Sequence, residues 1–306
     1  MAVSSADVMK LRQITGAGML DCKRALEEAG GDLEKAVDYL RKKGVEVAAK
    51  RETKSATEGV IASYVDGKGA GAVVEVNCET DFAARSEDFR QFCDTLARQI
   101  VHTQASGQSV EDLLAAKSLD NESLTVDDLL SELTAKLGER VLVRRFVRYA
   151  IDDCDTGDCQ DETTQGLVAS YIHAGEQIGV LLEINCATDA AANSPELAEF
   201  ARNIAMQIAA MQPRWVAPED VPQEAIDRDR EVLTEQAVAE GKPENIAAKM
   251  VEGRLKKFYS QTCLLNQPYI RDDALTIEEL LSELTGRLGD EIIVRRFARY
   301  QVGEDL

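Results

Sequence analysis

The chain has 306 residues, of which 44% are hydrophobic and 29% charged, so it is long enough for two or three domains with buried cores. Its 55 acidic and 35 basic residues give a formal net charge of −20, which favours protein partners over nucleic acid or anionic membranes. Neither a secretory signal nor an apolar run of the ~20 residues that span a bilayer is visible, and a cytoplasmic protein is expected. Seven scattered cysteines, an odd number, indicate reduced thiols rather than a disulfide framework.

Residues 1–50 predict a small domain of three helices. Apolar residues recur at helical spacing, with Val8, Leu11 and Ile14 on one face of the first helix. Glycines follow each segment and predict the helix ends, the last of them at Gly44. The expected helices are residues 5–15, 20–29 and 32–43, and the polar residues 51–57 are a predicted linker.

The rest of the chain is an internal repeat. The string EGVIASYV at 58–65 matches QGLVASYI at 165–172, and residues 124–149 share 16 of 26 positions with residues 275–300. The repeat predicts two related core subdomains, called N and C below. They cover residues 58–150 and 165–306, and residues 151–164 join them.

Each copy changes its hydrophobic period along its length. In the first copy, two β-like runs flank the glycine-rich residues 66–71, which predicts a hairpin. Ser86 begins a predicted helix, residues 126–137 form another, and residues 141–149 alternate as a strand whose period breaks at Arg144 and Arg145. Each half is therefore predicted to be an α+β unit of hairpin, helices and returning strand.

The second copy carries an insertion. The offset between copies grows from 108 residues at Asn77/Asn185 to 151 at Leu124/Leu275, so about 43 residues are added, roughly residues 213–267. Helical stretches at 222–240 and 243–259 predict an inserted helical hairpin. The residues expected to line its seam are Ile226, Leu233, Ala237, Ile246, Met250 and Leu255.

Nothing in the sequence assembles an enzyme site. The two histidines, His102 and His173, belong to no catalytic motif, and no base lies near Cys78 in sequence to activate it as a nucleophile. The strings NCETD and NCATD occur once in each half, which favours strand ends capped by Thr or Asp over catalysis. Cys154 and Cys159, among aspartates, lack the ligand set of a metal site and are interpreted as part of a linker. No enzyme activity, metal or cofactor is expected.

The two copies differ at one place where a protein contact could be made. Phe82 and Arg85 in the first copy correspond to Ala190 and Asn193 in the second. An aromatic residue there could fill the core or enter a pocket on a partner. The difference between the copies favours the partner contact.

The strings TGAGMLDCKRAL, NCETDFAAR and KPENIAAKMVEGRLKKF occur in this order, and with them the chain resembles the elongation factor Ts family over nearly its whole length. The resemblance implies a ubiquitin-associated-like (UBA-like) N-terminal domain, two core subdomains and a helical hairpin inserted in the second. It also implies a guanine-nucleotide exchange factor that needs no cofactor. Such a factor binds elongation factor Tu, dislodges its Mg²⁺ and releases GDP.

The resemblance also implies which residues contact elongation factor Tu. The family's Thr-Asp-Phe-Val motif corresponds to Thr80, Asp81, Phe82 and Ala83. Its Phe enters between helices near the switch region of the GTPase, and the motif dislodges the bound Mg²⁺. The other implied contacts are Arg12, Met19 and Leu20 in the N-terminal domain, Leu137, and His173 near the phosphate loop of the partner.

Several alternatives stay open at this point. An adaptor with a UBA-like module would bind another protein without exchange activity. Some family members dimerise, so a homodimer or a heterotetramer with elongation factor Tu is compatible with the resemblance. Some members also carry a further C-terminal module, for which this sequence has no counterpart after its last predicted strand.

Overall fold

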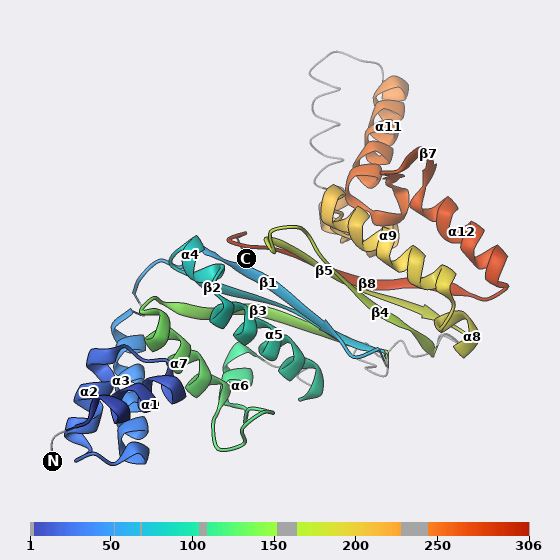
Figure 1. Ribbon diagram of the computed structural model, residues 1–306. Coiled ribbons are helices and arrows are strands. Elements are labelled where there is room, and N and C mark those ends of the chain that lie inside the picture. The colour runs from blue at the N-terminus through green and yellow to red at the C-terminus, as the bar shows by residue number, and fades with distance from the viewer. Residues whose placement is uncertain are drawn as a thin grey trace.

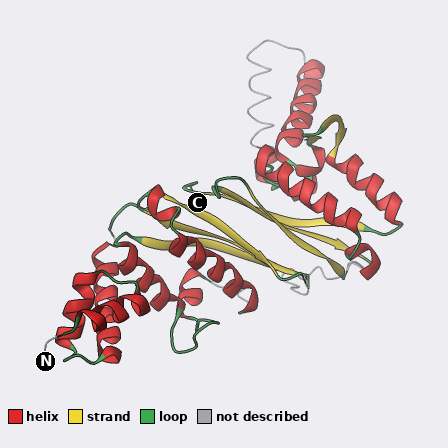
Figure 2. Cartoon of the chain, viewed as in Figure 1, coloured by secondary structure: helices red, strands yellow, loops and turns green. Residues whose placement is uncertain are grey.

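The structure is a computed structural model that describes residues 3–51, 53–67, 69–103, 109–151, 164–227 and 244–305. Figure 1 shows N-terminal helices at one end, two sheets in the middle, and further helices at the other end. Figure 2 gives the same view by type of secondary structure. No helix in these described ranges is both long and apolar enough to cross a lipid bilayer.

The N-terminal helices are α1 (Ser5–Thr15), α2 (Met19–Glu28) and α3 (Leu33–Arg51). Ser4 caps α1, whose Val8 and Leu11 are buried against α2 as predicted. The assignment of Ile14 to this buried face was wrong, because its side chain is 59% exposed. The predicted ranges of the first two helices match the structure to within one residue.

The third helix corrects the predicted stop at Gly44. Helix α3 continues through this glycine to Arg51, the first residue of the predicted linker. A Cβ atom at Gly44 would lie 3.3 Å from Ala135 Cβ and 3.4 Å from the Ser131 carbonyl oxygen. The glycine thus permits close packing of α3 against helix α7 (Val126–Leu137), and it is tolerated inside a helix for that reason.

Each half contains a three-stranded antiparallel sheet, which confirms the α+β class. The order is β1-β2-β3 in the first half and β4-β5-β8 in the second. The break predicted at Arg144 and Arg145 is a β-bulge, where Glu75 pairs with Arg145 and Val76 pairs with Val143. The strands are β1 (Glu58–Val65), β2 (Ala70–Cys78), β3 (Val141–Ala150), β4 (Gln165–Ile172), β5 (Ile178–Cys186) and β8 (Ile292–Gln301).

Helices cover the outer face of each sheet. Buried Phe89 and Leu96 of α5 pack on Val74 of the first sheet, and α9 packs on the second sheet in the same way. The predicted cap of α5 is confirmed, because the Ser86 hydroxyl accepts a hydrogen bond from the Phe89 N–H. The helices of the two halves are α4 (Asp81–Ala84), α5 (Glu87–His102), α6 (Val110–Ala115), α7 (Val126–Leu137), α8 (Asp189–Ala192), α9 (Pro195–Met211), α11 (Glu244–Thr262) and α12 (Ile277–Leu288).

The inner faces of the two sheets pack against each other. Ile61 and Val73 of the first half meet Leu181 and Val168 of the second half in one buried cluster. Alternation along the strands explains this double burial, because successive side chains point to opposite faces of a sheet. The two halves thus form a layered body, with helices outside and sheets inside (Figure 1).

Several short elements of both halves, and the insertion of the second half, complete the fold. Short helices α4, α6 and α8, and the small hairpin of β6 (Pro268–Tyr269) and β7 (Asp272–Thr276), were not predicted. Helix α11 occupies the second predicted arm of the insertion and ends at Thr262. Most of the first arm, with Leu233 and Ala237, lies outside the described residues, as do the side chains of Ile246 and Met250 and both linker residues Cys154 and Cys159.

Candidate protein-binding site

A single helical turn follows the central strand of the first sheet. Thr80 is its N-cap, and its hydroxyl accepts a hydrogen bond from the Ala83 N–H at 3.2 Å. Glu139, just after α7, accepts hydrogen bonds from the Thr80 N–H at 3.0 Å and from its hydroxyl at 2.8 Å. Ala83 and Ala84, which belong to this turn, are buried against the core of the first half. The turn α4 is therefore fixed on both sides by the sheet end and by Glu139.

Phe82 projects from this fixed turn. Its side chain is 82% exposed, the highest value among the large apolar side chains of the described residues. The core-filling alternative considered for this residue is therefore wrong. Asp81 and Arg85 form an exposed ion pair at 3.1 Å beside it. Such a pair adds little stability, but it holds both charges on the turn that carries the aromatic ring.

The second half repeats the turn without the aromatic residue. Thr188 caps α8, and Asp290 accepts hydrogen bonds from its N–H at 3.1 Å and from its hydroxyl. The Thr188 hydroxyl and backbone N–H groups hold the pKa of Asp290 below its usual value. Ala190 stands where the first half has Phe82. The scaffold is duplicated, but the aromatic tip is present in one copy.

The cysteines beside these turns are structural. Cys78 is fully buried and its thiol donates to the Thr80 carbonyl oxygen at 3.2 Å. Burial, with the Glu139 charge adding to it, raises the pKa of Cys78 to about 12. Cys186 makes the equivalent contact with Thr188, and burial raises its pKa as well. Neither thiol is activated as a nucleophile, and Thr80 and Thr188 confirm the expected capping role of these strings.

Among the described residues, no group of three or more His, Cys, Asp or Glu side chains is arranged to hold a metal ion.

His173 is exposed in the turn between β4 and β5, where its Nδ1 shares a hydrogen bond with the Tyr171 hydroxyl at 2.9 Å. This turn docks on the first half: the Ile61 N–H donates to the Glu176 carbonyl oxygen at 2.7 Å, and Gln177 Nε2 donates to the Gly59 carbonyl oxygen at 2.8 Å. Gly59 pairs with a residue at the end of β2, three residues before Thr80. The structure therefore brings the His173 turn to the end of the paired sheets that carries Phe82 (Figure 1).

The remaining predicted contact residues lie in two other places. Arg12 is exposed on α1, and Met19 and Leu20, 42% and 74% exposed, begin α2. Ile14 is also exposed there, and sequence reasoning missed it because its spacing matched the buried face. Leu137 ends α7, two residues before Glu139, and its half-buried side chain packs on the core of the first half.

The fold and this tip define the class of the molecule. It is a duplicated α+β scaffold that presents one aromatic side chain on a fixed turn, as a protein-binding surface does. A family model described as elongation factor TS matches residues 79–304.

Curated relatives agree over the length of the chain. It is 43% identical to elongation factor Ts of Clostridium botulinum (strain Eklund 17B / Type B), with 99% of this chain and 94% of that protein covered. It is 44% identical to elongation factor Ts of Symbiobacterium thermophilum, with 99% and 93% covered. It is 42% identical to elongation factor Ts of Lawsonia intracellularis, with both chains fully covered. The chain belongs to the elongation factor Ts family.

Proposed function

We propose that this chain is a guanine-nucleotide exchange factor for elongation factor Tu in translation elongation. It binds the GDP-bound GTPase, dislodges Mg²⁺ and releases GDP. The observation that carries this proposal is the 82% exposure of Phe82 on a fixed turn, in a chain of the elongation factor Ts family. An exposed aromatic ring on a rigid support enters a pocket on a partner with little loss of conformational freedom.

The proposed mechanism requires differential affinity and no bond chemistry. GDP in a GTPase is held by Mg²⁺ and by a loop whose backbone N–H groups face the phosphates. Displacing the ion leaves the phosphate charge uncompensated, which weakens GDP binding. The chain must therefore bind the nucleotide-free GTPase more tightly than the GDP-bound form, because only such a difference shifts the equilibrium. No cofactor is needed for this.

The tip residues divide into contact and support. Phe82 is the proposed wedge, and the exposed ion pair of Asp81 and Arg85 meets the partner beside it. Thr80 and Ala83 support the turn rather than contact the partner, because Thr80 is hydrogen-bonded to Glu139 and the Ala83 side chain is buried. They hold the aromatic ring in its outward position.

The other proposed contacts act at a distance from the tip. His173 reaches the GTPase from the β4–β5 turn. The exposed start of α2 provides an apolar contact through Met19 and Leu20, and the exposed Arg12 of α1 provides a charged one. Leu137 contributes through its remaining exposed surface near Glu139.

The domain division proposed here follows the repeat. It comprises a UBA-like domain of residues 1–50 and a linker of residues 51–57, of which the first residue belongs to the end of α3. Subdomains N (residues 58–150) and C (residues 165–306) follow, and a second linker joins them. The second subdomain includes the hairpin insertion of about residues 213–267. We place the protein in the cytoplasm, where translation takes place. Its partner is elongation factor Tu, and the chain acts as a homodimer or in a heterotetramer with that partner.

Release of fluorescent GDP from elongation factor Tu, followed by stopped flow, tests the function. The intact chain should accelerate release strongly. Binding without acceleration would instead support the adaptor, a protein-binding role that the exposed apolar residues of the N-terminal helices could also serve.

A further inference from the structure

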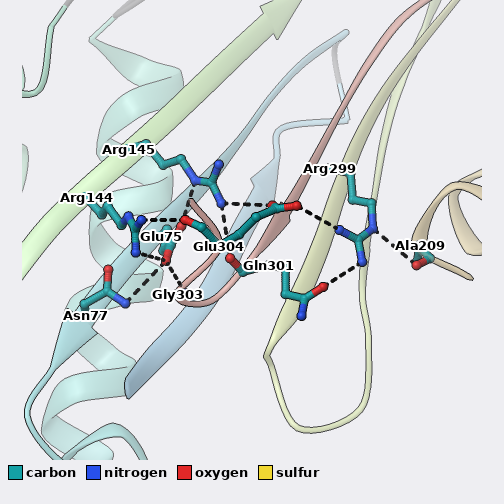
Figure 3. A network of polar contacts seen from close by, with 9 residues as sticks. All are labelled: Glu75, Asn77, Arg144, Arg145, Ala209, Arg299, Gln301, Gly303 and Glu304. Carbon is teal, nitrogen blue, oxygen red and sulfur yellow. Dashed lines mark hydrogen bonds and ion pairs between the residues drawn. The ribbon is translucent and has the colours of Figure 1, made fainter. Parts of the chain in front are cut away.

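The end of the chain crosses from the second half of the molecule to the first. Strand β8 belongs to the second sheet, and the residues that follow it reach the first sheet (Figure 3). The Gly303 N–H donates to Glu75 Oε1 at 2.9 Å, and Arg145 Nη2 donates to the Gln301 carbonyl oxygen at 3.1 Å. Arg144 donates to the carbonyl oxygen of Glu304. Residues 301–304 are called the C-terminal clasp below.

The clasp is attached to a buried charge. Glu75, on the central strand β2, is fully buried and accepts from Arg145 Nε at 2.7 Å, from Asn77 Nδ2 at 3.3 Å and from the Gly303 N–H. A carboxylate removed from water needs such partners, and charge-assisted hydrogen bonds are the strong ones. A backbone N–H of the clasp is therefore one of the groups that satisfy Glu75.

Glu304 joins arginines from both halves. Its carboxylate lies 3.4 Å from Arg145 of β3 and 3.8 Å from Arg299 of β8. Arg299 is itself held by the Ala209 carbonyl oxygen at 3.3 Å, at the end of α9, and by Gln301 Oε1 at 2.9 Å. Figure 3 shows these side chains converging on the clasp between the two sheets.

A reciprocal pair of contacts aligns the same surfaces. The Arg145 guanidinium of the first half lies 4.2 Å from the Tyr300 ring centre of the second, and Arg296 of the second half lies 4.4 Å from the Tyr149 ring centre of the first. Each arginine is bonded through Nε to a buried glutamate of its own sheet. The clasp thus adds to an interface at which the orientation of the two sheets is already specified.

The clasp also contacts the His173 turn and the strand that leads to the Phe82 turn. The Val302 N–H donates to the Gln177 carbonyl oxygen at 2.9 Å, in the turn that carries His173. Glu75 lies on β2, which ends at Cys78 and leads directly into the turn that carries Phe82. The clasp is therefore hydrogen-bonded both to the turn that carries His173 and to the strand that leads to Phe82.

We propose that the C-terminal clasp is a positioning device, which fixes the Phe82 tip and the His173 turn relative to each other so that both engage the GTPase at once. This inference rests on the proposed exchange function. Two contacts on one rigid body bind together without further ordering, whereas contacts on loosely joined bodies lose that advantage.

The test compares the intact chain with a variant that ends at Val302, each with Phe82 and with Phe82→Ala. GDP release from elongation factor Tu is measured at subsaturating factor. Truncation should slow release by about threefold to tenfold when Phe82 is present, because contacts that share a support couple energetically. It should change release by less than about twofold in the Phe82→Ala chain, because the main contact of the tip, which the clasp would align with the His173 turn, is already lost.

The matched control is Asp305→Asn, which removes one negative charge beside the clasp while all the contacts of residues 301–304 remain. It should release GDP at the rate of the intact chain. An equal loss on truncation in both backgrounds is the result of a merely structural role and would overturn the positioning proposal. No acceleration by the intact chain would instead reject the exchange function.

A second measurement needs no partner. The Ile61 N–H of the first half donates a hydrogen bond to the Glu176 carbonyl oxygen of the second half, whereas the Val74 N–H belongs to the central strand of the first sheet. Native-state hydrogen exchange of the truncated chain should be about tenfold faster at Ile61 and unchanged at Val74. Unchanged exchange at Ile61 would overturn the clasp proposal whatever the GDP assay gives. Faster exchange at both amides would overturn it too, because it indicates general destabilisation.

Discussion

Replacing Phe82 by alanine should weaken nucleotide exchange far more than folding. The ring is 82% exposed in the free chain, so its removal leaves no cavity, and the free energy of unfolding should change by less than about 0.5 kcal/mol. In the complex the ring would be buried, and full burial of a phenylalanine side chain is worth about 2–3 kcal/mol. At about 1.4 kcal/mol per factor of ten, kcat/KM for GDP release should fall about 30- to 150-fold.

Stopped-flow release of fluorescent GDP from elongation factor Tu measures this change over a range of factor concentrations. The matched control is Leu119→Ala, which also removes an exposed apolar side chain (44% exposed) but lies away from the tip, after α6. A second control moves the ring to the other copy of the turn by combining Phe82→Ala with Ala190→Phe, and it should not restore exchange. A Phe82→Ala chain within twofold of the intact chain, or an equal loss in Leu119→Ala, would refute the assignment of Phe82 as the wedge.

Four further predictions concern stability and thiol chemistry. Thr80→Ala should lower the free energy of unfolding by about 1 kcal/mol through loss of the cap, measured by urea denaturation; an unchanged value would argue against a fixed tip. Gly44→Leu should destabilise by about 1–3 kcal/mol because α3 packs closely on α7, whereas Gly286→Ala, with open space around it in α12, should stabilise by about 0.5–1 kcal/mol. The Thr125 N–H holds the pKa of Asp128 below its usual value of 3.8, so the folded state binds fewer protons there than the unfolded state. The Tm difference between the intact chain and Asp128→Ala should therefore be full at neutral pH and shrink below a pH of about 4; a constant difference would contradict this sign. Cys78, with its pKa raised to about 12, should resist iodoacetamide in the native chain, and Cys78→Ala should keep its exchange rate; rapid alkylation of the native chain at this residue would contradict the structural role of the thiol.

Most helix and strand positions could be predicted from the sequence because their signals are local. Ser86 and Thr125 cap the helices that follow them through their own hydroxyls, and Gly138 ends α7 with a left-handed backbone. The bulge at Arg144 was visible as a break in the alternation of β3. These features depend on residues a few positions apart, so they can be recognised in the sequence alone.

The errors in the prediction concern tertiary contacts. Gly44 has the local character of a helix stop, but α7 approaches it from 90 residues away and makes a glycine necessary inside the helix. Ile14 has the spacing of a buried residue, but none of the elements that pack on α1 covers it. Neither the approach of α7 to Gly44 nor the exposure of Ile14 can be inferred from the residues of the helix itself.

The duplication of the core, the main helices and strands of each copy, and the aromatic residue at one of the two capped turns could all be predicted from the sequence. Tertiary packing, in contrast, leaves Phe82 facing the solvent and brings the His173 turn onto β1, beside the strand that leads to Phe82. It also brought residues 301–304 onto Glu75, more than 200 positions earlier in the chain. Hydrophobic periodicity and helix capping act between residues that are near in sequence, whereas the exposure and juxtaposition of side chains depend on which distant surfaces pack together.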